Sequence, residues 1–200
     1  METLPDPDCL KQQPHVNWEH RGVLINWLME IHSRFRFLHE TLFLCVNILD
    51  RLLSVRAVSL QKLQLVGVAC LLIACKYEET CSPSVAEIVH LCDKQYKADE
   101  IVRAEQYVLK AINWNLSFPG PMGWLRRGSK ADEYDEKART IAKYFLEVGC
   151  LEKDLIGIPS SLTAAASLWL ARLIIGREEW VSPVYVCPLC LDLRRPDLDP

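Results

Sequence analysis

The sequence predicts an all-α protein, and three observations carry that prediction. Glycine is scarce, with 8 residues in 200, so few sharp backbone turns are available. Apolar residues recur at three- and four-residue spacing over long stretches, as on one face of a helix. Alternating patterns typical of strands are nearly absent. Half of the residues are hydrophobic and 24% are charged, an ordinary globular composition for one large domain or two small ones.

Five helices are predicted in the first half of the chain, joined by short polar segments. The first covers residues 19–37, where an apolar stripe is formed by Val23, Leu24, Trp27, Leu28, Ile31 and Phe35. The second covers 41–53, which is apolar almost all round and is therefore expected to be largely buried. The third covers 60–79, with Ser59 as its N-cap. The fourth begins at a capping box, Ser84-Val85-Ala86-Glu87, and the fifth covers 98–112.

A boundary follows at residues 113–121, where asparagines precede Pro119, Gly120 and Pro121. Beyond it a helix is predicted over 132–148, and Pro159 is expected to open another that runs to about 175. Residues 69–74, ACLLIA, match residues 166–171, ASLWLA. This internal match predicts two copies of one five-helix unit, of which the second is incomplete.

Charge and cysteine usage exclude several classes of protein. The net charge of −3 implies no general attraction to nucleic acid or to an anionic membrane. The apolar run 65–75 is too short to span a bilayer, and the N-terminus carries no secretory signal pattern. The nine cysteines are an odd number, and five lie in helical, apolar surroundings: Cys45, Cys70, Cys75, Cys92 and Cys150. Buried, reduced thiols in a cytosolic or nuclear protein are therefore expected.

Neither a catalytic site nor a cofactor is predicted. No cysteine in a polar context lies at catalytic spacing from a histidine or an acid, so the chain is not expected to be an enzyme. Cys187-Pro188-Leu189-Cys190 is a single CxxC motif, and structural zinc needs two further ligands that are not nearby. A metal site is therefore not expected.

Four segments together resemble a cyclin box, in order and in spacing. They are HRGVLINWLMEIHSRFRF, ETLFLCVNILDRLLS, KLQLVGVACLLIACKYEE and RAEQYVLKAINWNLSFPGP. The opening LPDPDCLKQQPHVNWEHR resembles the segment before the box in B-type (G2/mitotic) cyclins, and FPGPMGWLRRGSKADEYD resembles the start of their second fold. The resemblance covers residues 4–180.

This resemblance implies the cyclin fold. Residues 1–19 would be a lead-in segment, 20–113 a complete N-terminal cyclin box, 114–121 a linker, 122–180 a partial C-terminal cyclin fold and 181–200 a divergent tail. B-type cyclins begin with a long segment that holds a degradation signal, followed by an N-terminal helix. Both would be absent here. The twenty residues after Trp180 are also too few to supply the two further helices of the second fold, so the chain is expected to be truncated at both ends.

The resemblance also implies a regulatory subunit, in the nucleus and the cytoplasm, that controls the G2/M transition. It would bind a cyclin-dependent kinase and activate it by positioning the kinase C-helix and activation segment. The kinase-binding residues implied are Ile73, Lys76, Tyr77, Glu105, Leu109, Trp114 and Leu116. Lys76 near a helix C-terminus has three donors for a partner, and the others supply apolar contact or charge around it.

Two further groups of residues are carried over from the family. Arg21 and Asp50 would form an ion pair inside the box that organises the fold. A docking patch for Arg-x-Leu motifs in substrates or inhibitors would consist of Val23, Leu24, Trp27, Glu30, Leu63 and Gln64. His20 stands where the family has an apolar thioether, and its polar ring is expected to weaken the binding of a leucine.

Two alternatives remain open from the sequence. The chain could be a truncated cyclin-like protein that does not activate a kinase. It could also be a cyclin-fold module of the type found in transcription factors that bind DNA. The local basic cluster, Arg126, Arg127 and Lys130, is too small to follow a phosphate backbone, which disfavours the second alternative.

Overall fold

The computed structural model describes residues 3–177, and in them every regular element is helical, as the sequence predicts. The chain runs in the order α1 (Trp18–Phe35), α2 (His39–Val55), α3 (Leu60–Glu78), α4 (Val85–Leu91), α5 (Ala98–Ala111), α6 (Pro121–Ala131), α7 (Glu136–Gly149), the short 3-10 helix η1 (Lys153–Leu155) and α8 (Ser160–Ile174). The five helices predicted in the first half are confirmed, each within about three residues at its ends.

The chain divides into two compact units. Unit 1 consists of residues 1–118 with 150–157, and unit 2 consists of 119–149 with 158–200. The first break falls inside the predicted linker 114–121. Residues 150–157 differ from the expectation, because they lie within the predicted partial fold but pack on unit 1. Ile156 is buried in the unit 1 core, and Cys150 and Leu151 pack against that core.

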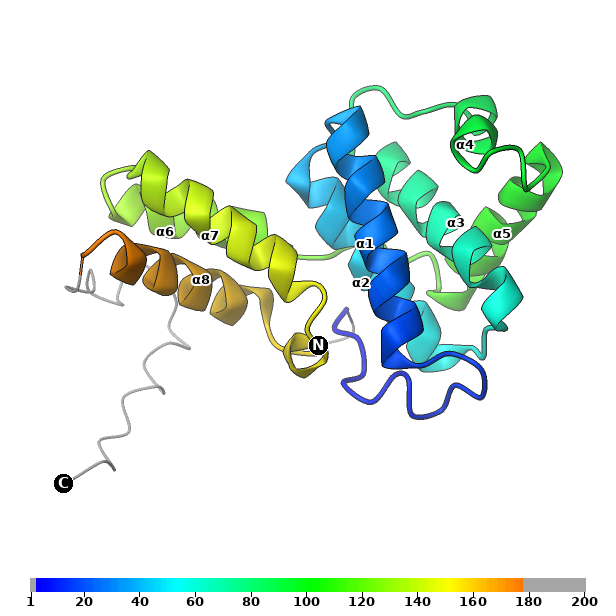
Figure 1. The fold of residues 1–200 in the computed structure, drawn as a ribbon, viewed down its shortest axis with the longest axis horizontal. Coiled ribbons are helices and arrows are strands. Elements are labelled where there is room, and N and C mark those ends of the chain that lie inside the picture. Colours follow the sequence, from blue (N-terminus) through cyan, green and yellow to red (C-terminus); the bar gives the residue numbers. More distant parts are fainter. Residues whose placement is uncertain (1–2, 178–200) are drawn as a thin grey trace. The chain divides into compact units, whose positions relative to one another are not determined.

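Helix α3 runs through the middle of unit 1, with α1, α2 and α5 packed around it (Figure 1). Its contact with α1 is close because Gly67 has no side chain. A Cβ added at Gly67 would lie 2.8 Å from Cδ1 of Leu24, which is closer than packed carbon atoms approach. Among the described helices, α3 alone is long and apolar enough to cross a membrane, and 67% of that stretch is buried inside the protein.

The N-termini of α3 and α4 test the two predicted helix caps. The box at α4 is confirmed, because Ser84 N donates to Glu87 Oε2 at 2.7 Å and Glu87 N donates to Ser84 Oγ at 3.3 Å. Ser59 occupies the N-cap of α3, but its side chain makes no capping bond. The Ser59 carbonyl accepts from Lys62 N at 3.0 Å instead.

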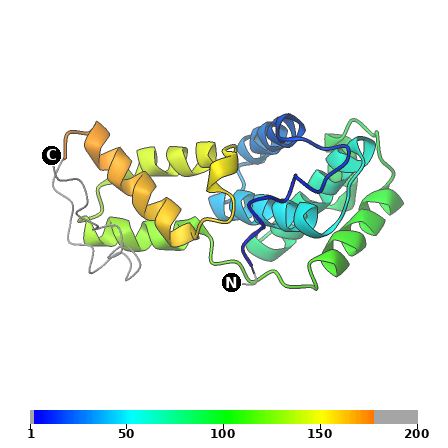
Figure 2. The ribbon, with the colours of Figure 1, turned by 90° about the horizontal axis from the view of Figure 1, so that it is seen from below.

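Unit 2 contains three helices among the described residues, and the sequence predicted two of them. Helix α6 was not predicted, although its residues lie in the segment that resembles the start of the second cyclin fold. Its signals are Pro121 at the first helical position and the apolar pair Met122 and Leu125. Helix α8 packs on both α6 and α7 and runs obliquely to them (Figure 2). It is the third helix of its unit, as α3 is of unit 1, so the two matching hexapeptides occupy equivalent places in helix order.

Of the five cysteines predicted to lie in apolar surroundings, Cys45, Cys70, Cys75 and Cys92 are buried thiols and Cys150 is half-buried. Burial raises the pKa of Cys75 to about 12, with a smaller contribution from the charge of Glu79. Cys81 is exposed. Residues 3–177 contain no group of three or more metal-ligating side chains, and the Cys187–Cys190 motif lies outside the described residues.

Candidate partner-binding site

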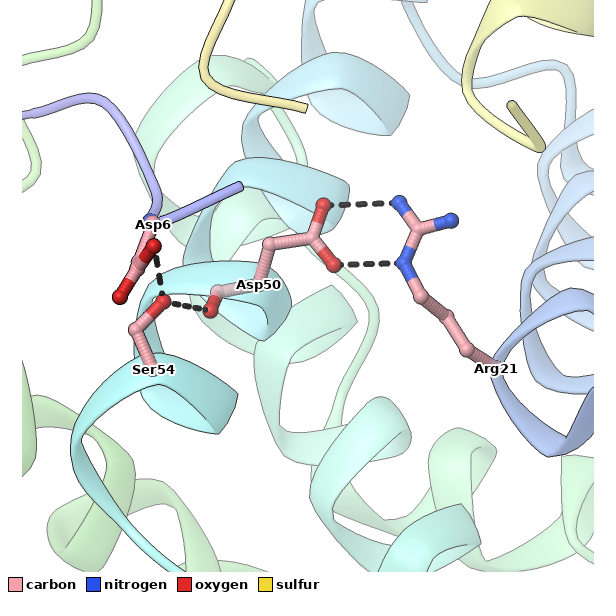
Figure 3. Close-up of polar contacts among 4 residues, drawn as sticks. All are labelled: Asp6, Arg21, Asp50 and Ser54. Carbon is pink, nitrogen blue, oxygen red and sulfur yellow. Dashed lines mark hydrogen bonds and ion pairs between the residues drawn. The ribbon is translucent and has the colours of Figure 1, made fainter. Parts of the chain in front are cut away.

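The predicted ion pair between Arg21 and Asp50 joins α1 to α2 inside unit 1 (Figure 3). Arg21 Nε donates to Asp50 Oδ1 at 2.7 Å, and Nη2 donates to Oδ2 at 2.8 Å. The two side chains are 1% and 4% exposed. Burial raises the pKa of the Asp50 carboxyl, and the hydrogen bonds from Arg21 oppose this shift. This bidentate geometry agrees with the fold-organising role implied by the family.

The lead-in segment, residues 1–19, forms hydrogen bonds with α2. Ser54 Oγ donates to the Asp50 carbonyl at 2.8 Å and accepts from Asp6 N at 3.1 Å (Figure 3). Further along, the Gln13 side-chain amide donates to the carbonyl of Leu53 at 2.7 Å. The lead-in is therefore part of unit 1 rather than a loose extension.

Lys76 and Glu105, which the family resemblance assigns to one binding surface, lie together. Lys76 Nζ, near the C-terminus of α3, donates to Oε1 of Glu105 on α5 at 2.6 Å. The lysine side chain is 45% exposed, whereas the glutamate side chain is only 11% exposed. The carboxylate is thus largely covered and holds the lysine in place, and one of three N–H donors on Nζ is used. Two donors on the half-exposed ammonium group are therefore left for a partner.

The apolar residues predicted around this pair divide by exposure. Tyr77 and Trp114 are 55% and 64% exposed, and Leu109 and Leu116 are half-buried against the core. Ile73 is 3% exposed and lies in the core, so its assignment to the binding surface is wrong. The reason is that the middle of α3 is enclosed by α1, α2 and α5, and the exposed residues at its C-terminal end begin only at Lys76.

Glu79 has a role that the sequence did not reveal. Its Oε1 accepts from Leu38 N at 2.7 Å and from the Thr41 hydroxyl at 2.5 Å, so it caps the start of α2 from the end of α3. The partners are distant in sequence, and no local pattern signals them. Glu79 therefore fixes the end of the helix that carries Lys76.

The predicted docking patch is only partly at the surface. Val23 is 66% exposed, Glu30 is exposed and Trp27 is half-buried. Leu24 and Leu63 are each 5% exposed and belong to the core, which corrects their assignment as surface members. The side-chain oxygen of Gln64 accepts from the Tyr96 hydroxyl at 3.2 Å. Val23, Trp27 and Glu30 of α1, with the half-buried Gln64 of α3, therefore form the accessible part of this patch.

His20, the departure from the family pattern, has a local explanation. Its amide donates to Asn17 Oδ1 at 2.9 Å, and its Nδ1 accepts from Asn17 N at 3.3 Å. This is a capping box in which an imidazole takes the place of the usual Glu or Gln. The sequence does not signal this box, because histidine is an uncommon member of that motif.

Comparison with solved structures defines the fold class as that of the cyclins. A viral cyclin from herpesvirus saimiri superposes with a TM-score of 0.77 at 20% identity, over 83% of this chain and 74% of that one. A chain of the yeast RNA Pol II CTD kinase CTDK-1 complex superposes with a TM-score of 0.73 at 14% identity, over 86% and 61%.

Sequence comparison agrees. The family "Cyclin, N-terminal domain" matches residues 1–117, and "Cyclin, C-terminal domain" matches residues 119–185. This chain belongs to the cyclin family.

Several relatives are mitotic cyclins, which confirms the predicted B-type resemblance. Identity is 51% over 180 residues both to the G2/mitotic-specific cyclin-B of Emericella nidulans and to the G2/mitotic-specific cyclin cdc13 of Schizosaccharomyces pombe. It is 45% over 178 residues to the G2/mitotic-specific cyclin-2 of Saccharomyces cerevisiae. These alignments cover 89–90% of this chain but only 36–38% of those proteins, so the chain spans a little over a third of their length.

Proposed function

We propose that this chain is a regulatory subunit that binds a cyclin-dependent kinase and activates it at the G2/M transition. One observation carries the proposal. The Lys76–Glu105 pair, with a 2.6 Å contact, lies where α3 emerges from the core. Two large exposed residues lie at the same helix ends: Tyr77 in the last turn of α3 and Trp114 just after α5. A charged donor together with exposed aromatic side chains is typical of interface hot spots.

The mechanism follows from what a kinase requires. Its strand lysine must pair with a glutamate of the C-helix before the phosphates of ATP are held correctly. A rigid helical surface that binds only the inward position of the C-helix shifts the kinase toward that state without performing chemistry. Glu105 and Glu79 supply the rigidity here, because each fixes the end of α3 by hydrogen bonds. The chain itself would be non-catalytic, with no cofactor, and would act in the nucleus and the cytoplasm.

Removal of the lysine side chain tests this function. Lys76→Ala is expected to weaken binding to a purified mitotic cyclin-dependent kinase by about 2 kcal/mol or more, roughly thirty-fold in Kd, as for a hot-spot residue. Helical content should not change, since the lysine side chain is 45% exposed. Isothermal titration would give the affinity and circular dichroism the helical content.

The chain offers a matched control. Lys62 also bridges α3 to α5, with Nζ 4.0 Å from Glu100 Oε1 and 58% of its side chain exposed. Lys62→Ala should leave kinase affinity within a factor of two. Equal effects of the two substitutions, or no effect of either, would contradict the proposed site. A kinase assay on the same complexes distinguishes activation from binding alone. Binding without a rise in kinase activity would support the alternative of a cyclin-like protein that does not activate a kinase.

The α1 patch is proposed to bind Arg-x-Leu motifs. Val23 and Trp27 would contact the leucine above the buried Leu24, and the exposed Glu30 would pair with the arginine. A fluorescent Arg-x-Leu peptide should bind saturably to the purified chain, and Trp27→Ala or Glu30→Ala should each weaken it by about tenfold, or about 1.4 kcal/mol. A peptide with alanine for arginine is the control. Failure of the natural peptide to reach saturation would rule out the patch.

A further inference from the structure

Trp114 lies in a backbone turn whose conformation is unfavourable for residues other than glycine. It follows α5, and both Asn113 and Trp114 adopt positive φ angles, 55° and 57°. Two consecutive left-handed residues that are not glycine are costly, so the surrounding structure must hold them there. The Trp114 side chain is 64% exposed and therefore gives the turn little packing support of its own.

Backbone hydrogen bonds close this turn from one side. Trp114 N donates to the Leu109 carbonyl at 2.8 Å, and Asn113 N donates to the Lys110 carbonyl at 3.2 Å. These bonds satisfy carbonyls at the end of α5 in the manner of a Schellman motif, where glycine is the usual left-handed residue. With no glycine present, the bonds leave a conformational cost that another contact has to offset.

Arg51, a residue of α2, forms hydrogen bonds with backbone carbonyls of this turn. Its Nη1 donates to the Asn115 carbonyl at 2.9 Å, and its Nη2 lies 3.5 Å from the Ile112 carbonyl. The two carbonyls stand on either side of Trp114 in the chain. Nη1 also lies 3.5 Å from Asn47 Oδ1, and the Asn47 amide donates to the Thr3 carbonyl at 2.8 Å. One buried guanidinium thus joins the turn to α2 and, through Asn47, to the lead-in.

The setting of Arg51 shows why an arginine is needed. It is 9% exposed, and within residues 3–177 its hydrogen-bond partners are carbonyl and amide oxygens, with no carboxylate among them. Burial lowers the pKa of its guanidinium. The carbonyl end of α5 favours a cation, and a planar fork with several donors can reach two carbonyls at once, which a lysine ammonium does not do in the same way.

We propose that Arg51 is a positioning residue for kinase binding, which holds the 112–115 turn so that Trp114 projects from the surface in a fixed place. This inference rests on the proposed function, because Trp114 is taken to contact the kinase. Arg51 itself is buried, at 9% exposure, and is not expected to contact the kinase. It acts only through the turn, so its effect on affinity should depend on the presence of the Trp114 side chain.

A double-mutant cycle on the full 200-residue chain tests this dependence. Arg51→Met is expected to weaken the affinity for a purified mitotic cyclin-dependent kinase by about tenfold in the wild-type background, and by less than about twofold in the Trp114→Ala background. Equal losses in the two backgrounds would overturn the inference. An undetectable affinity of the wild-type chain would instead contradict the proposed function, so the two failures are distinguishable.

Two further measurements separate positioning from general stability. Ile25→Val shortens a fully buried side chain of α1, a helix that packs on α2 and α3, and it should lower the melting temperature without changing kinase affinity. Arg51→Lys keeps the charge and is the milder change if Arg51→Met does not fold. In it, hydrogen exchange at the Trp114 amide should accelerate while exchange at the Val108 amide in α5 does not. Unchanged exchange at Trp114 in Arg51→Lys, together with unchanged affinity, would overturn the inference.

Discussion

An Asp50→Asn substitution is expected to destabilise unit 1 by about 3–5 kcal/mol, because it leaves the Arg21 guanidinium buried without its charged partner. Both side chains are almost fully covered, at 4% and 1% exposure, so water cannot replace the lost contact. Two hydrogen bonds of 2.7 and 2.8 Å are weakened at once. Urea denaturation followed by circular dichroism would measure the change in the free energy of unfolding.

The matched control for this substitution is Glu30→Gln, an acid-to-amide change on the exposed face of α1, which should alter stability by less than about 0.5 kcal/mol. The double variant Arg21→Met/Asp50→Leu replaces the pair with apolar side chains and should recover much of the loss, since no unpaired charge remains. A double variant as unstable as Asp50→Asn would show that the buried charge is not the cause.

Arg172→Met is expected to have an effect of similar size on unit 2. Arg172, near the end of α8, forms an ion pair with Asp132, the residue that follows α6, and the two side chains are 8% and 7% exposed. Removal of the arginine leaves the Asp132 carboxylate buried without its cation, at a cost of about 3–5 kcal/mol. A neighbouring pair, Arg177 with Asp135 at 2.9 Å, is half-exposed on the arginine side and should not compensate.

Hydrogen exchange would locate the damage from Arg172→Met. Amides of Leu168 and Ala171 in α8 should lose protection, whereas those of Val68 and Leu72 in α3 should keep theirs. Arg177→Met is the control. That arginine side chain is 50% exposed, and Asp135 keeps its hydrogen bonds from Lys137 N and Ala138 N, so the loss should cost less than about 1 kcal/mol. Uniform loss of protection in both units would contradict a local effect of the Asp132 pair.

Much of unit 1 could be predicted from the sequence because its helices are long and strongly patterned. Helix α2 is apolar almost all round, and α3 changes from apolar residues to Lys76 at the point where it leaves the core. Helix α6 was harder, since it is short and its apolar residues are few. The pair of Lys76 and Glu105 came from family resemblance, and the geometry then placed the two atoms 2.6 Å apart.

Tertiary contacts between distant residues were beyond the sequence. Three contacts join residues that only the folded chain brings together: Glu79 with Leu38, Asp132 with Arg172, and Arg51 with Asn115. The sequence pattern also failed to predict which apolar residues of α1 and α3 are buried. Leu24, Leu63 and Ile73 belong to motifs that border a surface, but helical spacing alone does not say how far a neighbouring helix covers each one.

Residues 150–157 have a consequence for how the protein is made. They complete unit 1, with Ile156 in its core and Gly157 at a positive φ of 78° close to Pro7, yet they follow α7 in the chain. During synthesis, the first five helices therefore leave the ribosome before the residues that finish their own core. The core of unit 1 is completed only after all of α6 and α7 has been translated, so two helices of unit 2 are synthesised before unit 1 is complete.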